Sequence, residues 1–180
     1  MTQFKQVFID EEKNSEIRNY WETPQWIVDQ LNKVFSFTVD AAANSSNNKF
    51  ERYFDENADG LKQPWDGEVV FCNPPHSKGA YGAWVDKAQL EFLNSAVTSV
   101  LVLPHNWETR GFSGVRDDAA YLILPHKRIK YDPPLDVDGS GPTFYSCIAI
   151  FTWYTLSDVQ IDSLLKIGHV IDLKSGMLTR

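Results

Sequence analysis

The sequence predicts an α/β protein with a mostly parallel sheet, helices on both faces and an antiparallel hairpin towards the C-terminus. Strand-like and helix-like segments alternate along much of the chain, a pattern that produces parallel strands. The run Val97–Leu103 is almost wholly apolar, as in strands that are buried on both faces of a sheet. Ligands of such sheets bind at the carboxyl ends of the strands.

The first helix is expected directly after Thr23-Pro24. Threonine suits the N-cap, and proline suits the first helical position because its φ angle is already helical and no N–H is needed there. One apolar stripe at helical spacing follows, formed by Ile27, Leu31, Val34 and Phe35. A short strand, Phe37–Asp40, comes next and ends in an acidic residue.

The middle of the chain predicts three further strands around one amphipathic helix. Val69–Cys72 is an apolar strand, and Val97–Leu103 and Ala120–Leu124 are two more. The helix between the first two is marked by Tyr81, Trp84, Val85, Ala88 and Phe92.

The pattern changes in the last third of the chain. Arg128–Tyr131 and Ser146–Thr152 are predicted to form the antiparallel hairpin, joined by a loop rich in proline, glycine and aspartate. Ser157 and Gln160 have the spacing of a capping box, so a helix is expected there, ending near Gly168. A last short strand is expected over residues 169–173.

Size and composition favour a single domain over residues 1–180, with residues 1–18 as a loose N-terminal arm. The net charge of −7 argues against a non-specific nucleic-acid binder, although His126–Lys130 is locally basic. No apolar run approaches the roughly 20 residues that cross a membrane, and no secretory signal is visible, so the expected location is the cytoplasm. Cys72 and Cys147 are expected to be free thiols, and no histidine or cysteine spacing predicts a metal site.

The motif Asn73-Pro74-Pro75-His76 follows an apolar strand directly. Prolines cannot continue the hydrogen-bond ladder, so the strand must end there in a stiff turn. The Asn73 side-chain oxygen and the Pro74 carbonyl could accept both hydrogens of an aromatic amino group and stabilise positive charge that develops on its nitrogen. The ring of His76 could stack on a flat substrate. An ordinary Asn-Pro turn is the alternative interpretation.

The motif and its neighbours resemble the phage Dam-type DNA N6-adenine methyltransferases. Besides Asn73-Pro74-Pro75, the resemblance rests on Tyr20–Pro24, Val39–Ala43, Asp59-Gly60-Leu61 and Pro64-Trp65, in that order, and on the later segments Leu103-Pro104, Arg128–Tyr131 and Ser146–Ile148. It covers roughly residues 18–152. It implies a Rossmann-like methyltransferase sheet, S-adenosyl-L-methionine as cofactor, and double-stranded DNA as partner. The gene would belong to a phage or prophage, and the protein would act in the bacterial host cell.

The resemblance also implies cofactor-binding residues. Thr23-Pro24 would contact the methionine carboxylate, which a helix N-terminus favours. Asp40 and Ala41 occupy the first cofactor loop, where Asp40 would face the cationic end of the cofactor. Asp59 would bind the adenine amino group, with Gly60 and Leu61 beside the ring. The ribose-binding acid is either Glu51 or Asp55.

For the DNA, the resemblance implies that the target adenine flips out of the duplex. Tyr131 would lie against the flipped base, and Lys127, Arg128 and Lys130 would contact phosphates. Ser77 and Lys78 could form a lid beside the base. The DNA-reading loops are expected within residues 76–82, 105–118 and 132–144. The recognised sequence and the oligomeric state are not predicted, although GATC sites are common in the family.

The chain departs from the general methyltransferase pattern at two places. Ala41-Ala42-Ala43-Asn44 replaces the usual glycine-rich turn, and His76 replaces a tyrosine or phenylalanine. A protonated His76 would place a cation near a nitrogen that becomes positive, which would reduce activity. Two alternatives stay open: methylation of a glutamine amide in a protein, and a DNA-binding module with the methyltransferase fold but no activity.

Overall fold

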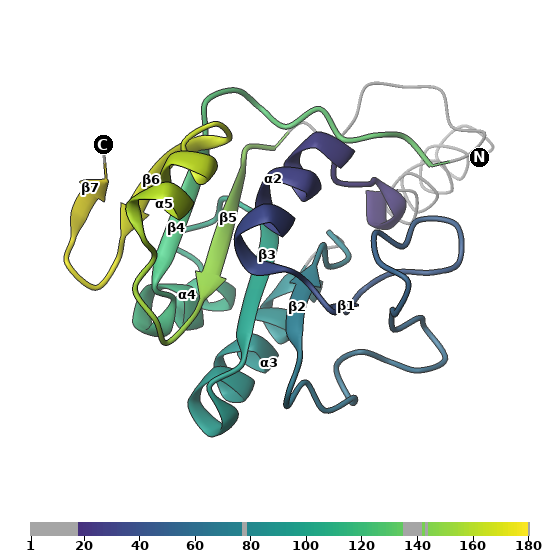
Figure 1. Cartoon of the computed structure of the whole chain (residues 1–180). Coiled ribbons are helices and arrows are strands. Elements are labelled where there is room, and N and C mark those ends of the chain that lie inside the picture. The colour runs from purple at the N-terminus through teal and green to yellow at the C-terminus, as the bar shows by residue number, and fades with distance from the viewer. Residues whose placement is uncertain (1–17, 77–78, 135–141, 143, 180) are drawn as a thin grey trace, which may run out of the picture.

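A seven-stranded sheet forms the centre of the computed structural model, which describes residues 18–76, 79–134, 142 and 144–179 (Figure 1). The strand order is β1-β2-β3-β5-β4-β6-β7. The strands are β1 (Val39–Asp40), β2 (Val69–Cys72), β3 (Thr98–Pro104), β4 (Tyr121–Pro125), β5 (Ser146–Phe151), β6 (Gly168–Asp172) and β7 (Met177–Thr179). The predicted strands at 69–72, 97–103, 120–124 and 169–173 are therefore confirmed within one or two residues.

The prediction of a mostly parallel sheet is wrong. Only β1–β2 and β2–β3 are parallel pairs, and the remaining four pairings are antiparallel. The reason is that β5 lies between β3 and β4 and runs opposite to both. A central antiparallel strand is buried on both faces just as a parallel one is, so the apolar run in the sequence does not distinguish the two.

One edge of the sheet nevertheless collects the carboxyl ends of four strands. β1, β2 and β3 run in parallel, and β4 points the same way as β3 because both are antiparallel to β5. The segments that follow these four strands therefore begin at the same edge. The Asn73–His76 motif is one of them, since it follows β2.

Helices cover both faces of the sheet, as predicted. Helices α2 (Gln25–Phe35) and α5 (Asp158–Leu164) pack on one face, where they share a core with β3, β4 and β5. Helices α3 (Ala80–Ser95) and α4 (Ser113–Asp118) pack on the other face, in a second core (Figure 1). Two short 3-10 turns, η1 (Arg18–Tyr20) and η2 (Arg110–Phe112), complete the helical elements of the described residues.

Helix α2 begins one residue later than expected. Pro24 is the N-cap rather than the first helical residue, and Thr23 makes no capping hydrogen bond. The Pro24 carbonyl accepts from the Ile27 N–H at 3.0 Å, so the first turn is closed without a side-chain cap. The Thr23 hydroxyl is thereby left available for another partner.

The predicted hairpin of Arg128–Tyr131 with Ser146–Thr152 does not form. Residues 128–131 are not a strand, and β5 pairs with β3 and β4 instead. Ile129 and Tyr131 point into the core, so this segment is held by side-chain burial and by a single bridge between Asp132 and Glu22. The capping box at Ser157 and Gln160 is confirmed, whereas β7 was not predicted.

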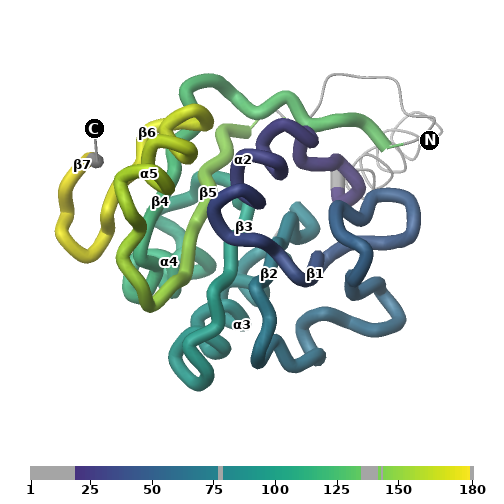
Figure 2. The backbone as a smooth tube through the Cα atoms, viewed as in Figure 1, coloured from purple at the N-terminus to yellow at the C-terminus, as the bar shows by residue number. Residues whose placement is uncertain are grey.

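The long connection between β1 and β2 extends beyond the β1 edge of the sheet (Figure 2). Trp65 anchors this connection, because its side chain is fully buried and its Nε1 donates to the Gly60 carbonyl at 3.0 Å. Cys72 and Cys147 are buried free thiols. Within residues 18–179, apart from the short gaps, no helix combines the length and apolarity needed to cross a bilayer.

Gly168 supports a direct prediction about stability. A Cβ added there would lie 2.1 Å from the Leu124 carbonyl oxygen, so Gly168→Ala forces β4 and β6 apart. We expect the free energy of unfolding to fall by at least about 2 kcal/mol, measured by denaturant titration. Ser95→Ala, at an exposed position at the end of α3, serves as the control and should change it by less than about 0.5 kcal/mol. An unchanged unfolding midpoint for Gly168→Ala would contradict the β4–β6 register.

Candidate active site

The Asn73–His76 turn lies between two cavities at the carboxyl edge of the sheet. Pro75 lines the first cavity, which measures about 270 Å³. His76, the next residue, lines the second cavity, of about 460 Å³. Among the described residues the two cavities share no lining residue, and this short turn contributes one residue to each.

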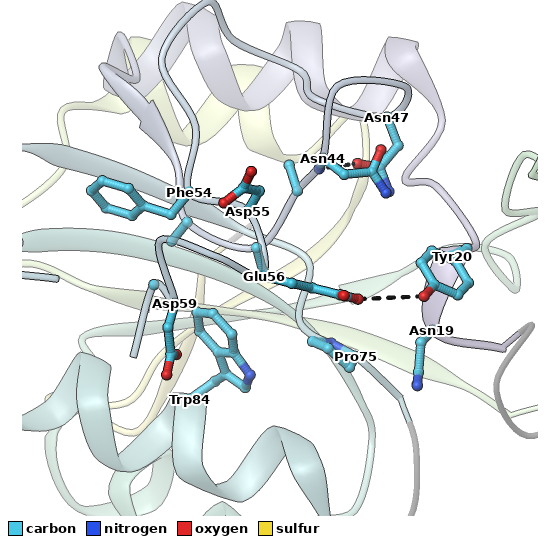
Figure 3. Close-up of a pocket in the computed structure, with 14 residues that line it drawn as sticks. Asn19, Tyr20, Asn44, Asn47, Phe54, Asp55, Glu56, Asp59, Pro75 and Trp84 are labelled. Atoms are coloured by element: carbon cyan, nitrogen blue, oxygen red, sulfur yellow. Dashed lines mark hydrogen bonds between the residues drawn. The ribbon is translucent and has the colours of Figure 1, made fainter. Parts of the chain in front are cut away.

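The first cavity is built mainly by the long β1–β2 connection (Figure 3). Trp84 of α3 contributes an aromatic wall, and the Tyr20 hydroxyl reaches across to Glu56 Oε1 at 3.4 Å. Carboxylates of Asp55, Glu56 and Asp59 stand around it. The complete lining is Asn19, Tyr20, Ala41, Ala42, Ala43, Asn44, Asn47, Phe54, Asp55, Glu56, Asp59, Gly60, Pro75 and Trp84.

The loop directly after β1, residues 41–48, contains no glycine. Its turn is held by asparagine side chains: Asn47 Oδ1 accepts from the Asn44 N–H at 2.7 Å, and Asn44 Oδ1 accepts from the Ser46 N–H at 2.8 Å. No residue of this loop has a positive φ, so no position in it requires glycine. The close approach occurs instead at Gly60, where a Cβ would lie 2.1 Å from the Ala41 carbonyl oxygen.

A narrow polar pocket adjoins the first cavity and shares Asn19, Ala42 and Asn47 with it. Asp40 lies in this pocket and is only 2% exposed. Burial raises the pKa of Asp40 to about 6, although the backbone N–H groups of Lys49 and Ala42 donate to its carboxylate. A salt bridge of 2.6 Å between Lys49 and Glu22 stands beside it.

Two buried oxygen atoms in the narrow pocket have no hydrogen-bond partner among the residues that the structure describes. Asn73 Nδ2 donates to the Trp21 carbonyl at 2.9 Å, which leaves Asn73 Oδ1 without a hydrogen bond. The Thr23 hydroxyl is also buried and unpaired. Because an unsatisfied buried polar atom is costly, these oxygens indicate a place where a ligand would bind.

The second cavity combines flat side chains with a polar network. His76, Tyr81 and Phe144 contribute aromatic rings to its lining. Gly79, Pro104 and Gly111 also line it. The Tyr81 hydroxyl is 2.9 Å from the Thr109 hydroxyl and accepts from Asn106 Nδ2 at 3.2 Å. This combination suits a flat ligand with hydrogen-bonding edges.

His76 is neutral near pH 7. Burial lowers its pKa to about 4, and neither ring nitrogen has a hydrogen-bond partner within the described part of the chain. Its ring contacts Phe144 and Tyr131, with centroid distances of 5.0 and 5.6 Å. The structure thus argues against the protonated His76 that the sequence suggested as a cause of reduced activity.

Tyr131, which the sequence predicts to lie against the target base, is not among the residues that line the second cavity. It is buried behind His76, and its hydroxyl lies 2.8 Å from Ser146 Oγ. Phe144 occupies the wall of the cavity instead. The Tyr131 ring packs against the His76 ring, with a centroid distance of 5.6 Å.

The predicted cofactor residues fall into three groups. Ala41, Asp59 and Gly60 line the first cavity, and Thr23 and Asp40 line the adjoining narrow pocket. Pro24 and Leu61 line neither, since Pro24 caps α2 and Leu61 packs against the second core. Of the two candidate ribose-binding acids, Asp55 lines the first cavity and Glu51 does not.

The predicted DNA-contacting residues do not gather around one cavity. Lys127, Arg128 and Lys130 are exposed around a different cavity, and Ser77 and Lys78 lie outside the described residues. The loop at 105–118 contributes Asn106, Thr109 and Gly111 to the second cavity. Of the loop at 132–144, residues 135–141 and 143 are likewise not described.

Several lining residues were missed from the sequence. Tyr81 and Trp84 were assigned to the core face of α3, yet each also borders a cavity. Asn106, Thr109 and Glu56 lie in connecting segments, where polar residues are common and carry no distinctive spacing. No group of three or more potential metal ligands occurs among the described residues.

Comparison with known proteins shows the family of the chain. A family model described as DNA N-6-adenine-methyltransferase (Dam) matches residues 10–160. A DNA N-6-adenine-methyltransferase of Escherichia phage T1 is 30% identical over 128 residues, which cover 69% of this chain and 50% of the relative. The chain thus spans about half the length of that curated relative. With most of its length matched, the chain belongs to the Dam family of DNA N-6-adenine-methyltransferases.

Proposed function

We propose that this protein transfers a methyl group from S-adenosyl-L-methionine to the N6 amino group of adenine in double-stranded DNA, with the adenine flipped out of the duplex. The observation that carries the proposal is the position of the Asn73–His76 turn between two cavities. A methyl donor in the first cavity and a flat acceptor in the second would approach the same turn from opposite sides. Membership of the Dam family supports DNA adenine as the acceptor.

The first cavity and the narrow pocket fit the chemistry of the cofactor. The buried carboxylate of Asp40 suits its ammonium group, and the free Thr23 hydroxyl beside the start of α2 suits its carboxylate. Asp55, Glu56 and Asp59 can accept from ribose hydroxyls and an adenine amino group, and Trp84 offers a flat surface. When bound, S-adenosyl-L-methionine supplies an electrophilic methyl group.

The residues of the turn would act on the acceptor amine. Asn73 Oδ1 is buried and unpaired, and its orientation is fixed because Nδ2 of the same amide donates to Trp21. Together with the Pro74 carbonyl, it would accept the two N–H hydrogens and stabilise the positive charge that develops on nitrogen. Two fixed acceptors also orient the lone pair towards the donor side of the turn.

The second cavity supplies the environment for a flipped base. His76 presents a neutral ring, so it can stack on the base without repelling a nitrogen that becomes positive. The Tyr81, Asn106 and Thr109 network could contact the edge of the base. The phage origin of the T1 relative supports a phage- or prophage-encoded enzyme that acts inside a bacterial cell.

The test is transfer of a labelled methyl group from S-adenosyl-L-methionine to unmethylated duplex DNA, with the product nucleosides identified. We expect label in N6-methyladenine. Asn73→Ala should lower the rate about a hundredfold or more, because it removes an acceptor that acts at the developing charge. Asn94→Ala, at an exposed position on α3, is the matched control and should retain full activity.

Two results would overturn the proposal. Full activity of Asn73→Ala would refute the role of its amide. No label in DNA, with cofactor binding intact, would leave methylation of a protein amide or a binding module without activity as the remaining alternatives.

Asp40 predicts a pH dependence of cofactor binding. Its pKa is raised to about 6, so it is a carboxylate near pH 7 and becomes neutral as the pH falls through that value. A neutral Asp40 cannot attract the ammonium group, so affinity for S-adenosyl-L-methionine should fall by up to about tenfold per pH unit below 6. Calorimetric titration from acid to neutral pH measures this, and Asp40→Asn should bind weakly with little dependence on pH. A flat profile in the wild type would mean that Asp40 does not face the ammonium group.

His76 predicts the outcome of an aromatic exchange. Because His76 acts as a neutral ring, His76→Phe should keep the turnover rate within about threefold, whereas His76→Ala should lose about tenfold from weaker stacking. Rates under saturating cofactor and DNA, beside melting temperatures of both variants, measure this. Equal losses in the two variants would show that a ring nitrogen, and not the ring plane, is required.

A further inference from the structure

A third cavity, of about 370 Å³, lies apart from the methyl-transfer site and shares no lining residue with the two cavities there. We call it the Trp26 cavity. Three separate segments build it: the first turn of α2, the segment after β4, and the turn between α5 and β6. Its lining is Trp26, Ile27, Pro125, His126, Lys127, Arg128, Ile129, Lys130, Lys166 and Ile167.

Positive charge gathers around this cavity in a chain with net charge −7. Lys127, Arg128, Lys130 and Lys166 are all exposed, and no acidic residue lines the cavity. Among the described residues, none of these four cations makes a salt bridge. Their charge is therefore available to an anionic ligand.

The same cavity presents a flat apolar surface. Trp26 is 52% exposed although it lies on a helix whose neighbouring residue Ile27 is in the core. Ile27, Ile129 and Ile167 are buried and form the apolar base of the cavity. An exposed indole above an apolar base and beside cations suits a ligand that joins a planar ring to an anionic group.

We propose that the Trp26 cavity binds an unpaired nucleotide of the DNA, with the base on the Trp26 indole and its phosphates at Lys127, Arg128, Lys130 and Lys166. This inference rests on the proposed DNA substrate and adds a second nucleotide site, separate from the pocket of the target adenine. Stacking on an aromatic ring beside a basic surface is how proteins hold single-stranded nucleic acid without sequence preference.

The path of the chain links this cavity to the methyl-transfer site. The segment after β4 passes beside the start of α2 and leads to Tyr131, whose ring contacts His76 (Figure 1). Three residue steps separate Arg128 from Tyr131, and a chain extends by at most about 3.5 Å per residue, so their Cα atoms lie within roughly 11 Å. One strand of duplex DNA rises about 3.4 Å per nucleotide, so this upper bound is no longer than about three nucleotide steps. A strand whose target base lies at His76 could thus place a neighbouring nucleotide on Trp26.

Binding of oligonucleotides tests the proposal without relying on catalysis. Affinity of the full-length protein is measured for a labelled single strand and for a duplex, over a range of salt concentrations. Trp26→Ala should weaken single-strand binding about tenfold. Lys166→Ala should lower the slope of log affinity against log salt by about 0.7. Trp153→Ala is the matched control for Trp26→Ala, because Trp153 is 67% exposed and lies just beyond β5, at the end of the sheet opposite the carboxyl ends of β3 and β4. Lys33→Ala is the matched control for Lys166→Ala, because Lys33 is exposed in the last turn of α2. Both controls should bind as the wild type does.

The outcomes separate this inference from the proposed function. If the wild type methylates DNA while Trp26→Ala and Lys166→Ala bind like the controls, the Trp26 cavity is not a nucleotide site and the proposed function stands. If the wild type neither binds nor methylates DNA, both proposals fail. If free AMP competes through Trp26 but the oligonucleotide does not bind there, the occupant is a mononucleotide and the proposed DNA contact is wrong.

Discussion

The end of β2 is the constraint on which the candidate site depends. Pro74 and Pro75 cannot extend the ladder with β1 and β3, so the chain must leave the sheet at Asn73. The Trp21 carbonyl then holds the Asn73 amide by its nitrogen and leaves the oxygen unpaired. Within this short turn Pro75 lines one cavity and His76, the next residue, lines the other. Both the donor side and the acceptor side of the proposed reaction are set by this one interruption of the sheet.

Burial then sets the charge state on each side of the turn. It raises the pKa of Asp40 and lowers that of His76, because in both cases the charged form loses hydration. The consequences differ: His76 stays neutral where a cation would repel the acceptor, while Asp40 remains ionised near pH 7 but close to its titration range. The net charge of −7 therefore does not argue against the proposed DNA substrate, because the charges that matter are local. Four cations that make no salt bridge within the described residues lie around the Trp26 cavity, away from the turn.

Features encoded by neighbouring residues could be predicted from the sequence. The apolar stripe of α2, the proline stop after β2 and the capping box of α5 are local, and all three are present. The antiparallel insertion of β5 was missed because burial on both faces does not reveal the direction of a partner strand. The apolar alternation of Ile129 and Tyr131 predicted a strand as well. The chain instead buries these two side chains in a segment that is not part of the sheet, and burial alone does not distinguish the two cases. The meeting of Thr23, Asp40 and Asn73 in one pocket depends on three segments distant in sequence, and no local pattern predicts it.

The loop after β1 forms part of a cavity although it lacks the glycine-rich turn that is usual in methyltransferases. A glycine in a cofactor loop serves either a left-handed backbone or a close approach. Here the loop after β1 has no left-handed residue, because Asn44 and Asn47 form its turn through side-chain hydrogen bonds. The close approach is moved to Gly60, which packs directly against the backbone of Ala41. Asparagines in one segment and a glycine in another thus take over the two roles of the missing glycines. The absence of glycine after β1 therefore does not argue against the proposed cofactor cavity.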